Sequence, residues 1–124
     1  MANNRVLKVG PVALSATLTT NILNPAAAGS GTGYTPTASY IILRHIRILN
    51  KRSDGASATV SLWIGATGAN AAGTEFAFSA TPVAANQYVD WFGSLRLDAA
   101  DFLVGGASTA TSLVFIAEGE VGLA

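Results

Sequence analysis

Apolar and polar residues alternate along most of this chain, and this two-residue period is the feature that most limits its fold. The pattern is clearest over residues 58–64, where Val60, Leu62 and Ile64 occupy every second position. Successive side chains of a β-strand point to opposite faces, so the period is typical of strands that bury one face. The best helical candidate, residues 66–72, contains glycine and asparagine, which weaken helices. We therefore expect almost no helix.

About eight short segments are expected to form strands, and residues that favour turns separate them. The expected strands cover residues 5–9, 12–22, 39–50, 58–64, 76–78, 87–97, 102–104 and 113–118. Many short antiparallel strands at near-regular spacing predict a β-sandwich or jelly roll. A chain of 124 residues has the usual length of one domain. We expect a single all-β sandwich domain over residues 1–124, with residues 1–23 as an N-terminal arm or as added strands.

The segment 39–50 is the most hydrophobic and is rich in β-branched residues. Arg44 falls in the same register as its apolar face, which predicts a β-bulge or a buried ion pair there. Asp54 and Gly55 suit a tight reversal, so segments 39–50 and 58–64 are expected to pair as a hairpin. The residues expected in the core are Ile42, Ile46, Ile48, Val60, Leu62, Ile64, Leu113 and Phe115.

The segment 87–97 places two pairs of large side chains on opposite sides of one expected strand. Tyr88 and Phe92 fall on one side, and Val89 and Trp91 fall on the other. The residues that follow, 98–101, contain two aspartates and are expected to form a turn. The Gly/Pro-rich stretch 24–36 is expected to be a long surface loop.

Charge is scarce in this sequence. Charged residues make up 11% of the chain, and seven basic and seven acidic residues cancel. A free monomer usually relies on a charged surface for solubility, whereas subunit interfaces are depleted of charge. The composition therefore favours a homo-oligomer or a subunit of a larger assembly. It argues against nucleic acid as a partner, because phosphate contacts need a basic surface.

Further function classes are disfavoured by what the sequence does not contain. Cysteine is absent, which excludes disulfides and thiolate chemistry. No run of about 18 apolar residues is present, so a membrane partner is not expected. Proline and hydroxyl residues interrupt the N-terminal apolar stretch 9–18, which argues against a signal peptide.

No set of residues predicts catalysis or a bound cofactor. His45, the only histidine, is expected on a strand face, and no nucleophile motif accompanies it. Asp98, Asp101 and Asp54 could bind Ca²⁺, but aspartates in turns usually serve their own backbone. We expect no enzyme activity, no catalytic residue, no cofactor and no metal site.

Two further patterns allow a functional and a structural interpretation. The glycines of residues 29–33 resemble a phosphate-binding loop, but no helix or lysine follows them, so a flexible loop is expected. Glu118 and Glu120 share one side of the last strand, an arrangement that a solvated face explains better than acid–base chemistry. The tyrosines and tryptophans could form a sugar-stacking platform, but they are more typical of a core or a subunit interface.

Four segments together resemble small virion proteins of tailed bacteriophages. Residues 40–51 contain Ile-Leu-Arg-His-Ile-Arg-Ile-Leu-Asn, and residues 58–65 contain Thr-Val-Ser-Leu. Residues 87–92 and 97–103 are similar to the later strands of these proteins, which read Asn/Glu-x-Tyr-x-Trp and then Leu-x-x-Gly/Ala-Asp. The similarity covers about residues 34–118 and consists of strand patterns, with no site residues to carry over.

The resemblance implies that the chain is a structural component of a phage particle, with the virion as its location. Its expected function is that of a capsid decoration (cement) subunit, which binds and stabilises the head shell. A neck, collar or tail protein is the alternative, and a carbohydrate-binding β-sandwich is a further one. The expected partners are the major capsid protein or neighbouring virion proteins, with further copies of the chain, in a trimer by preference.

The surface expected to contact these partners contains large apolar and aromatic residues. The candidate interface residues are Leu14, Leu18, Ile22, Tyr34, Trp63 and Trp91. Residues 5–23 carry no charge after Lys8 and lie outside the resemblance. This segment is expected to be able to add a strand to a neighbouring subunit.

Overall fold

The computed structural model describes residues 4–25, 40–52, 54–68, 71 and 73–122, and all of its regular structure consists of β-strands. The strands of this described part are β1 (Asn4–Ala13), β2 (Asn21–Leu23), β3 (Tyr40–Asn50), β4 (Ala58–Gly65), β5 (Thr81–Val83), β6 (Tyr88–Asp98), β7 (Phe102–Ala107) and β8 (Leu113–Gly122). The expected all-β fold is confirmed.

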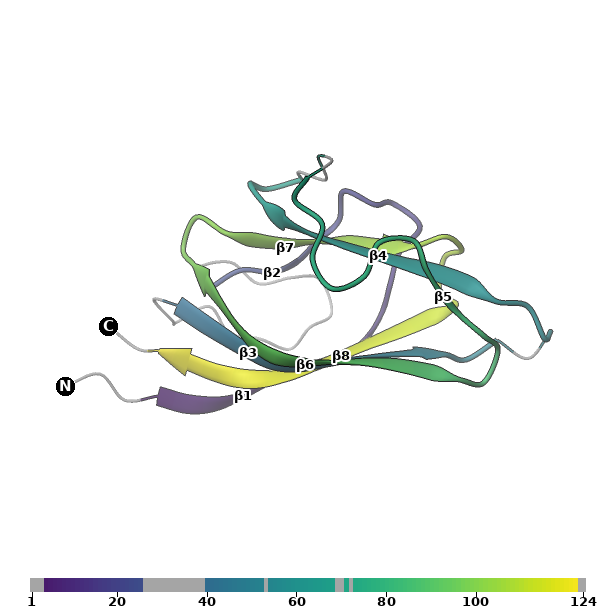
Figure 1. Ribbon diagram of the computed structural model, residues 1–124, viewed down its shortest axis with the longest axis horizontal. Helices are drawn as coiled ribbons and strands as arrows, with labels where there is room; N and C mark the ends of the chain where they lie inside the picture. Colours follow the sequence, from purple (N-terminus) through teal and green to yellow (C-terminus); the bar gives the residue numbers. More distant parts are fainter. Residues whose placement is uncertain (1–3, 26–39, 53, 69–70, 72, 123–124) are drawn as a thin grey trace.

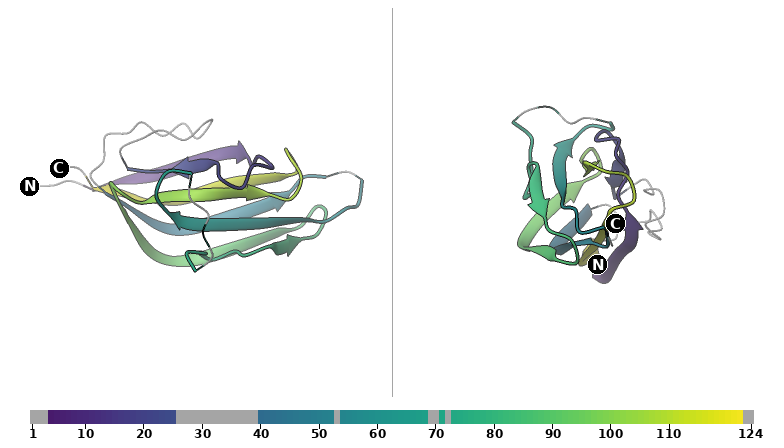
Figure 2. Two further views of the ribbon diagram at one scale, coloured as in Figure 1. Left: turned by 90° about the horizontal axis from the view of Figure 1, so that it is seen from above. Right: turned by 90° about the vertical axis from the view of Figure 1, so that its right-hand side faces the viewer.

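The strands form two four-stranded antiparallel sheets that face one another. The first sheet has the order β1-β8-β3-β6, and the second has the order β2-β7-β4-β5. Figure 1 shows the two layers edge-on, and Figure 2 shows them from above and from one end. The first sheet has much the longer strands: its four members span 10, 10, 11 and 11 residues. The architecture is a small β-sandwich.

Residues 4–23 contribute strands to both sheets. β1 lies at one edge of the first sheet, where it pairs with β8, and β2 pairs with β7 in the second. The described part of the segment therefore belongs to the sandwich of its own chain.

The predicted strand over residues 12–22 is wrong. β1 ends at Ala13 and β2 begins at Asn21, with a turn between them. The hydroxyls of Ser15 and Thr20 lie 2.6 Å apart, and Thr20 Oγ1 donates to the Thr17 carbonyl at 2.7 Å. Serine and threonine favour such local bonds over a sheet ladder, so an alternating pattern that contains many of them can form a turn.

The predicted hairpin of residues 39–50 and 58–64 is also wrong, because β3 and β4 belong to different sheets. The buried side chain of Asn50 explains the crossing. Its Nδ2 donates to the carbonyls of Ala56 at 3.2 Å and Val83 at 2.9 Å, and its Oδ1 accepts from the Arg52 amide at 2.9 Å. These bonds hold the chain as it passes from one layer to the other, where a tight turn would have kept it in one sheet.

The expected irregularity at Arg44 is confirmed as a bulge. The register of β3 shifts between Leu43 and His45 against both of its neighbours. The extra residue reverses which side of β3 faces inward, so that Ile41 and Leu43 are buried before the bulge and Ile42 is only half-buried. The expectation that Ile42 lies in the core is therefore wrong.

The core fills the space between the two sheets. Six of the residues expected there are fully buried, namely Ile46, Ile48, Val60, Leu62, Leu113 and Phe115. Ile64 is half-buried and packs against the edge of the cluster. Phe76 and Phe78 do not form the expected strand, although their amides bond to neighbouring carbonyls, and Pro82 lies within β5 instead of ending a strand.

Candidate surface site on the long-stranded sheet

The face of the first sheet that points away from the core, called here the outer face, collects much of the chain's charge. Strand alternation places buried residues such as Leu7, Ile46 and Leu97 on one side and polar residues on the other. The charged residues of the outer face are Lys8, Arg44, Arg47, Asp90, Arg96, Asp98, Glu118 and Glu120. In a chain with so few charges, this concentration distinguishes the outer face from the rest of the surface.

Three of these polar side chains form a network between β3 and β6. The Arg47 guanidinium donates to Asp90 through Nε at 2.8 Å and Nη2 at 3.0 Å, a bidentate pair. His45 Nε2 lies 3.0 Å from Oδ1 of the same carboxylate. The hydrogen bonds from Arg47, with a smaller contribution from His45 and against some burial, lower the pKa of Asp90 to about 2. Asp90 is therefore a fixed anion between two cross-strand neighbours.

Two exposed aromatic rings flank this network. Phe92 stacks on the His45 ring with centroids 4.5 Å apart and planes 8° from parallel. The Arg47 guanidinium carbon lies 4.1 Å from the centroid of the Tyr88 ring. Phe92 is 71% exposed and Tyr88 is 54% exposed, although both are anchored on one side. The geometry holds large apolar surfaces in fixed positions while leaving them open to solvent.

Two more ion pairs order the remainder of the outer face. Arg44 Nη2 contacts Glu120 Oε2 at 2.7 Å, and Arg96 Nε contacts Asp98 Oδ1 at 2.7 Å. Arg96 also lies over the Tyr40 ring, 4.3 Å from its centroid. Most charges of this face are thus neutralised by neighbours, and what the face presents is mixed polar and aromatic surface.

The second sheet differs, because chain segments cover its outward side. Trp63 and Val104 point away from the central core and are nevertheless buried. The turn of residues 15–20 lies over Gly106, and the Ala107 amide donates to the Ser15 carbonyl at 2.9 Å. The side chain of Asn21 binds the loop after β4, donating to Thr67 at 2.6 Å and accepting from the Gly68 amide at 2.7 Å.

The candidate interface residues are mostly internal. Leu14 and Ile22 lie in the core, and Trp63 is buried under the segments just described. Trp91 is half-buried on the inward side of β6, where the Phe76 ring meets it edge-on at 4.8 Å. Leu18 is 36% exposed beside Gly106. Tyr34 lies outside the described residues, as do the glycines of residues 29–33.

The structure does not bring the candidate catalytic and metal-binding residues together. Among the described residues, only Asp90 hydrogen-bonds to the His45 side chain. Asp54 pairs with Arg52, and Asp101 Oδ2 accepts from the Asp98 amide at 3.0 Å in the expected turn. No group of three or more metal-ligating residues occurs in the described part of the chain. Glu118 and Glu120 do share the outer face, as expected.

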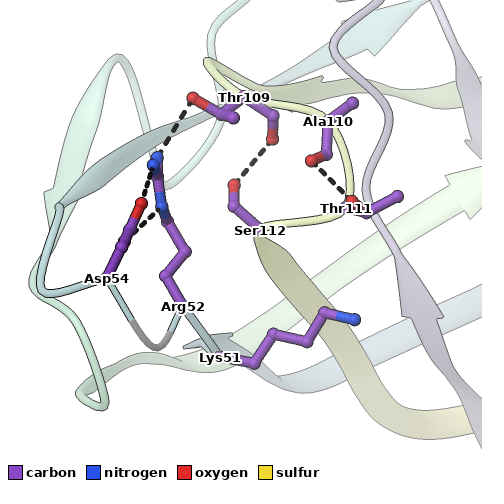
Figure 3. A pocket seen from close by; sticks show the side chains of 7 residues that line it. All are labelled: Lys51, Arg52, Asp54, Thr109, Ala110, Thr111 and Ser112. Carbon is purple, nitrogen blue, oxygen red and sulfur yellow. Dashed lines mark hydrogen bonds and ion pairs between the residues drawn. The ribbon is translucent and has the colours of Figure 1, made fainter.

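A polar pocket of about 360 Å³ lies between the residues that follow β3 and those that precede β8. Figure 3 shows the side chains that line it. Its lining residues are Lys51, Arg52, Asp54, Thr109, Ala110, Thr111 and Ser112. Asp54 holds Arg52 by two hydrogen bonds of 3.0 and 2.6 Å, so the charge of Arg52 is already paired within the pocket. The Lys51 side chain points away from this pair. The pocket is best explained as the contact between two connecting loops.

Sequence reasoning missed Tyr88 and Phe92 as the exposed aromatic residues. The signal was present, because both share the side of β6 that also carries Asp90 and Arg96. That side had to face solvent, which in turn places Trp91 inward. Leu49 is also 37% exposed, and no comparable pattern in the sequence predicts its exposure.

Comparison with family models, with curated proteins and with solved structures finds no match to this chain. Among the described residues, no helix is of a length and apolarity that could cross a membrane. The virion function implied by the resemblance thus stays a prediction.

Proposed function

We propose that the chain is a non-enzymatic structural subunit that attaches to a phage particle through its outer face, which includes the outward side chains of strand β6. In its specific form the proposal is a capsid decoration subunit, which binds the head shell in the virion and stabilises it. The observation that carries the proposal is Phe92, a ring that is 71% exposed yet stacked on His45.

An anchored, exposed aromatic ring suits a protein contact. Association costs free energy when mobile side chains become ordered, and residues that are already held reduce that cost. His45 and Arg47 hold Phe92 and Tyr88, and Asp90 holds both of these side chains in turn. Aromatic residues surrounded by polar groups are also the usual centre of a protein interface.

The charge pattern supports a partner bound through area more than through long-range attraction. The net charge is zero, and the cations Arg44, Arg47 and Arg96 are already paired within the chain. Binding should therefore depend weakly on salt, and many copies on a lattice would convert modest single contacts into durable attachment. Binding of the assembled state alone would also raise the heat resistance of the particle.

The test is to purify virions of the phage that encodes the chain and to measure copy number by quantitative gel densitometry. A decoration subunit predicts on the order of hundreds of copies, because it follows the symmetry of the shell. About a dozen or fewer would indicate the neck, collar or tail alternative. Absence from particles would refute both.

A variant pair tests the site itself by co-sedimentation with shells that lack the protein. Phe92→Ser should weaken binding at least about tenfold, because it removes the central aromatic contact. Leu18→Ser is the matched control: Leu18 is also apolar and exposed, but it lies beside Gly106 of the second sheet. Equal binding by both variants would contradict the assignment of the outer face.

A carbohydrate-binding sandwich is the second candidate, and it is favoured by the exposed rings of Tyr88 and Phe92 beside Asp90, with Glu118 two strands away on the same face. Sugars bind by stacking on aromatic rings while acids and cations bond to their hydroxyls. The test is retention on immobilised polysaccharides and binding to a glycan array. Specific binding that Phe92→Ser abolishes would make this the better assignment.

A further inference from the structure

The four edges of the two sheets differ in how well they are protected against pairing with another chain. β2 and β5 span three residues each, and β5 contains Pro82. β1 is longer but contains Pro11, and its register with β8 shifts between Val9 and Val12. Short strands, prolines and irregular edges are the devices that prevent edge-to-edge association.

β6 has neither a proline nor a short span, and its one irregularity is the register shift against β3 at Gly93 and Ser94. It contains 11 residues, and within the described part of the chain it pairs with β3 along one side only. Its first residue is Tyr88, and Phe92 lies near its middle; these are the two most exposed large hydrophobic residues described. β6 is therefore the edge most open to a further strand.

The residues of β6 are also arranged to complement a second copy. In an antiparallel pair related by a two-fold axis at Gly93, each residue faces the residue of the second copy that lies equally far from Gly93 on its other side. Asp90 then faces Arg96 of the second copy, and Arg96 faces its Asp90. Asp90 and Arg96 both lie on the outer face, so their side chains meet on the same side of the joined sheet. Opposite charges directly across an antiparallel pair stabilise it.

Other registers fit less well. An axis at Ser94 would set Asp90 against Asp98, and an axis at Asp90 would set that carboxylate against itself, and like charges across a pair are destabilising. An axis at Phe92 stacks Phe92 on its own copy but forms no ion pair. A register displaced by one residue from any of these is excluded, because it would set outward-facing residues of one copy opposite inward-facing residues of the other.

We propose that a second copy of this chain pairs with β6 edge to edge, about a two-fold axis at Gly93, so that the two long-stranded sheets join into one. The pairing deepens the proposed function, on which it rests, by naming the partner of the β6 edge. It is a dimer contact, in place of the trimer that the sequence favours.

Local features of β6 accommodate this contact. The register of β6 with β3 skips Gly93 and Ser94, which lie opposite the Arg44 bulge. Gly93 is exposed and has no side chain to obstruct an approaching strand at the axis. Asp90 already binds Arg47 and His45, and Arg96 already donates to Asp98 of its own chain through Nε. A carboxylate offers about four lone-pair sites and a guanidinium five N–H donors, so Asp90 can accept from Arg96 of the second copy as well. The zero net charge adds no repulsion between copies.

The first experiment measures the mass of the full chain by light scattering over a range of concentrations. The wild-type chain should show a monomer–dimer equilibrium, and Arg96→Asp should weaken the dimer at least about tenfold, because it opposes two anions twice per dimer. Lys8→Asp is the matched control, since Lys8 is an exposed cation on β1, the other edge of the same sheet. A monomer at every concentration, or equal weakening by both variants, overturns the inference.

The second experiment determines the register by cross-linking, which the absence of native cysteine makes clean. An axis at Gly93 sets Tyr88 opposite Asp98 of the second copy. An equimolar mixture of Tyr88→Cys and Asp98→Cys chains should therefore form mixed disulfide dimers in excess over either homodimer. Random or absent cross-linking contradicts the register.

The two proposals fail separately. Attachment to particles with a strictly monomeric free chain would refute the dimer and leave the structural function intact. A dimer in solution with no copies in virions would refute the structural function and leave the β6 pairing established.

Discussion

The outward sides of the two sheets are built in opposite ways. On the second sheet the turn of residues 15–20 and the loop after β4 cover the strands, and even Trp63 is buried there. On the first sheet no connecting segment of the described chain covers the strands, and Phe92 and Tyr88 stay exposed beside their side-chain neighbours. The same small domain thus buries both sides of one sheet and leaves one side of the other open.

The difference shows how a chain with few charges distributes them. The covered side carries glycine and hydroxyl residues, which let backbone segments approach closely, as Gly106 does. The open side carries ion pairs that link β3 to its neighbours, such as Arg47 with Asp90 and Arg44 with Glu120. Stability should therefore depend on packing at the second sheet, and association should depend on the side chains of the first.

The largest effect is expected from one substitution made on each sheet. Leu62→Ala, on β4 of the second sheet, should lower the free energy of unfolding by about 2–5 kcal/mol, because the side chain is fully buried. Leu49→Ala, on the outer face, should cost less than about half as much, since Leu49 is 37% exposed. Chemical denaturation of both variants measures the difference, and equal costs would mean that the outer face of the first sheet is packed as tightly as the core between the sheets.

A smaller effect is expected where the turn of residues 15–20 covers the second sheet. A side-chain carbon at Gly106 would collide with the Ser15 carbonyl oxygen. Gly106→Ala should therefore cost about 1–3 kcal/mol in the free energy of unfolding, the usual range for overpacking. Ser94→Ala on the open face is the control and should stay within about 0.5 kcal/mol. A tolerated Gly106→Ala, measured by thermal unfolding, would mean that the covering turn is loosely held.

The fold class and most of the core could be predicted because alternation reports directly on burial. The pairing of strands could not, because it depends on where a connection crosses between layers. Asn50 decides that crossing from β3 to β4 through buried hydrogen bonds that no local pattern encodes. Similarly, the Arg44 bulge was predictable, but its consequence for Ile42 required knowing that the register shifts against both neighbours.

The candidate surface was the harder part to predict. The expected interface residues were chosen for size and apolar character, which select core residues such as Leu14 and Ile22 equally well. The exposed rings are recognisable only from the polar residues that share their side of β6. The network joins Asp90 to Arg47 and His45, which are 43 and 45 residues away in the sequence, and a sequence pattern does not contain that proximity.

The smallest expected effect concerns that network and is visible as a pH dependence. Asp90 has a pKa of about 2 in the folded chain against an ordinary value of 3.8, because Arg47 and His45 stabilise its charged form. A lowered folded-state pKa contributes stability that is fully present above about pH 4 and is lost as the pH falls through about 2. Asp90→Asn should therefore cost about 1–2 kcal/mol in the free energy of unfolding near neutral pH, as expected for charge-assisted hydrogen bonds.

The difference in stability between wild type and Asp90→Asn should shrink as the pH falls from 4 toward 2, as followed by denaturant titration at each pH. Asp98→Asn is the control, because Asp98 pairs with Arg96 where both side chains are more than half exposed, and it should contribute less than about 0.5 kcal/mol. A constant difference between wild type and Asp90→Asn down to pH 2 would show that the carboxylate is not what holds the outer face in order.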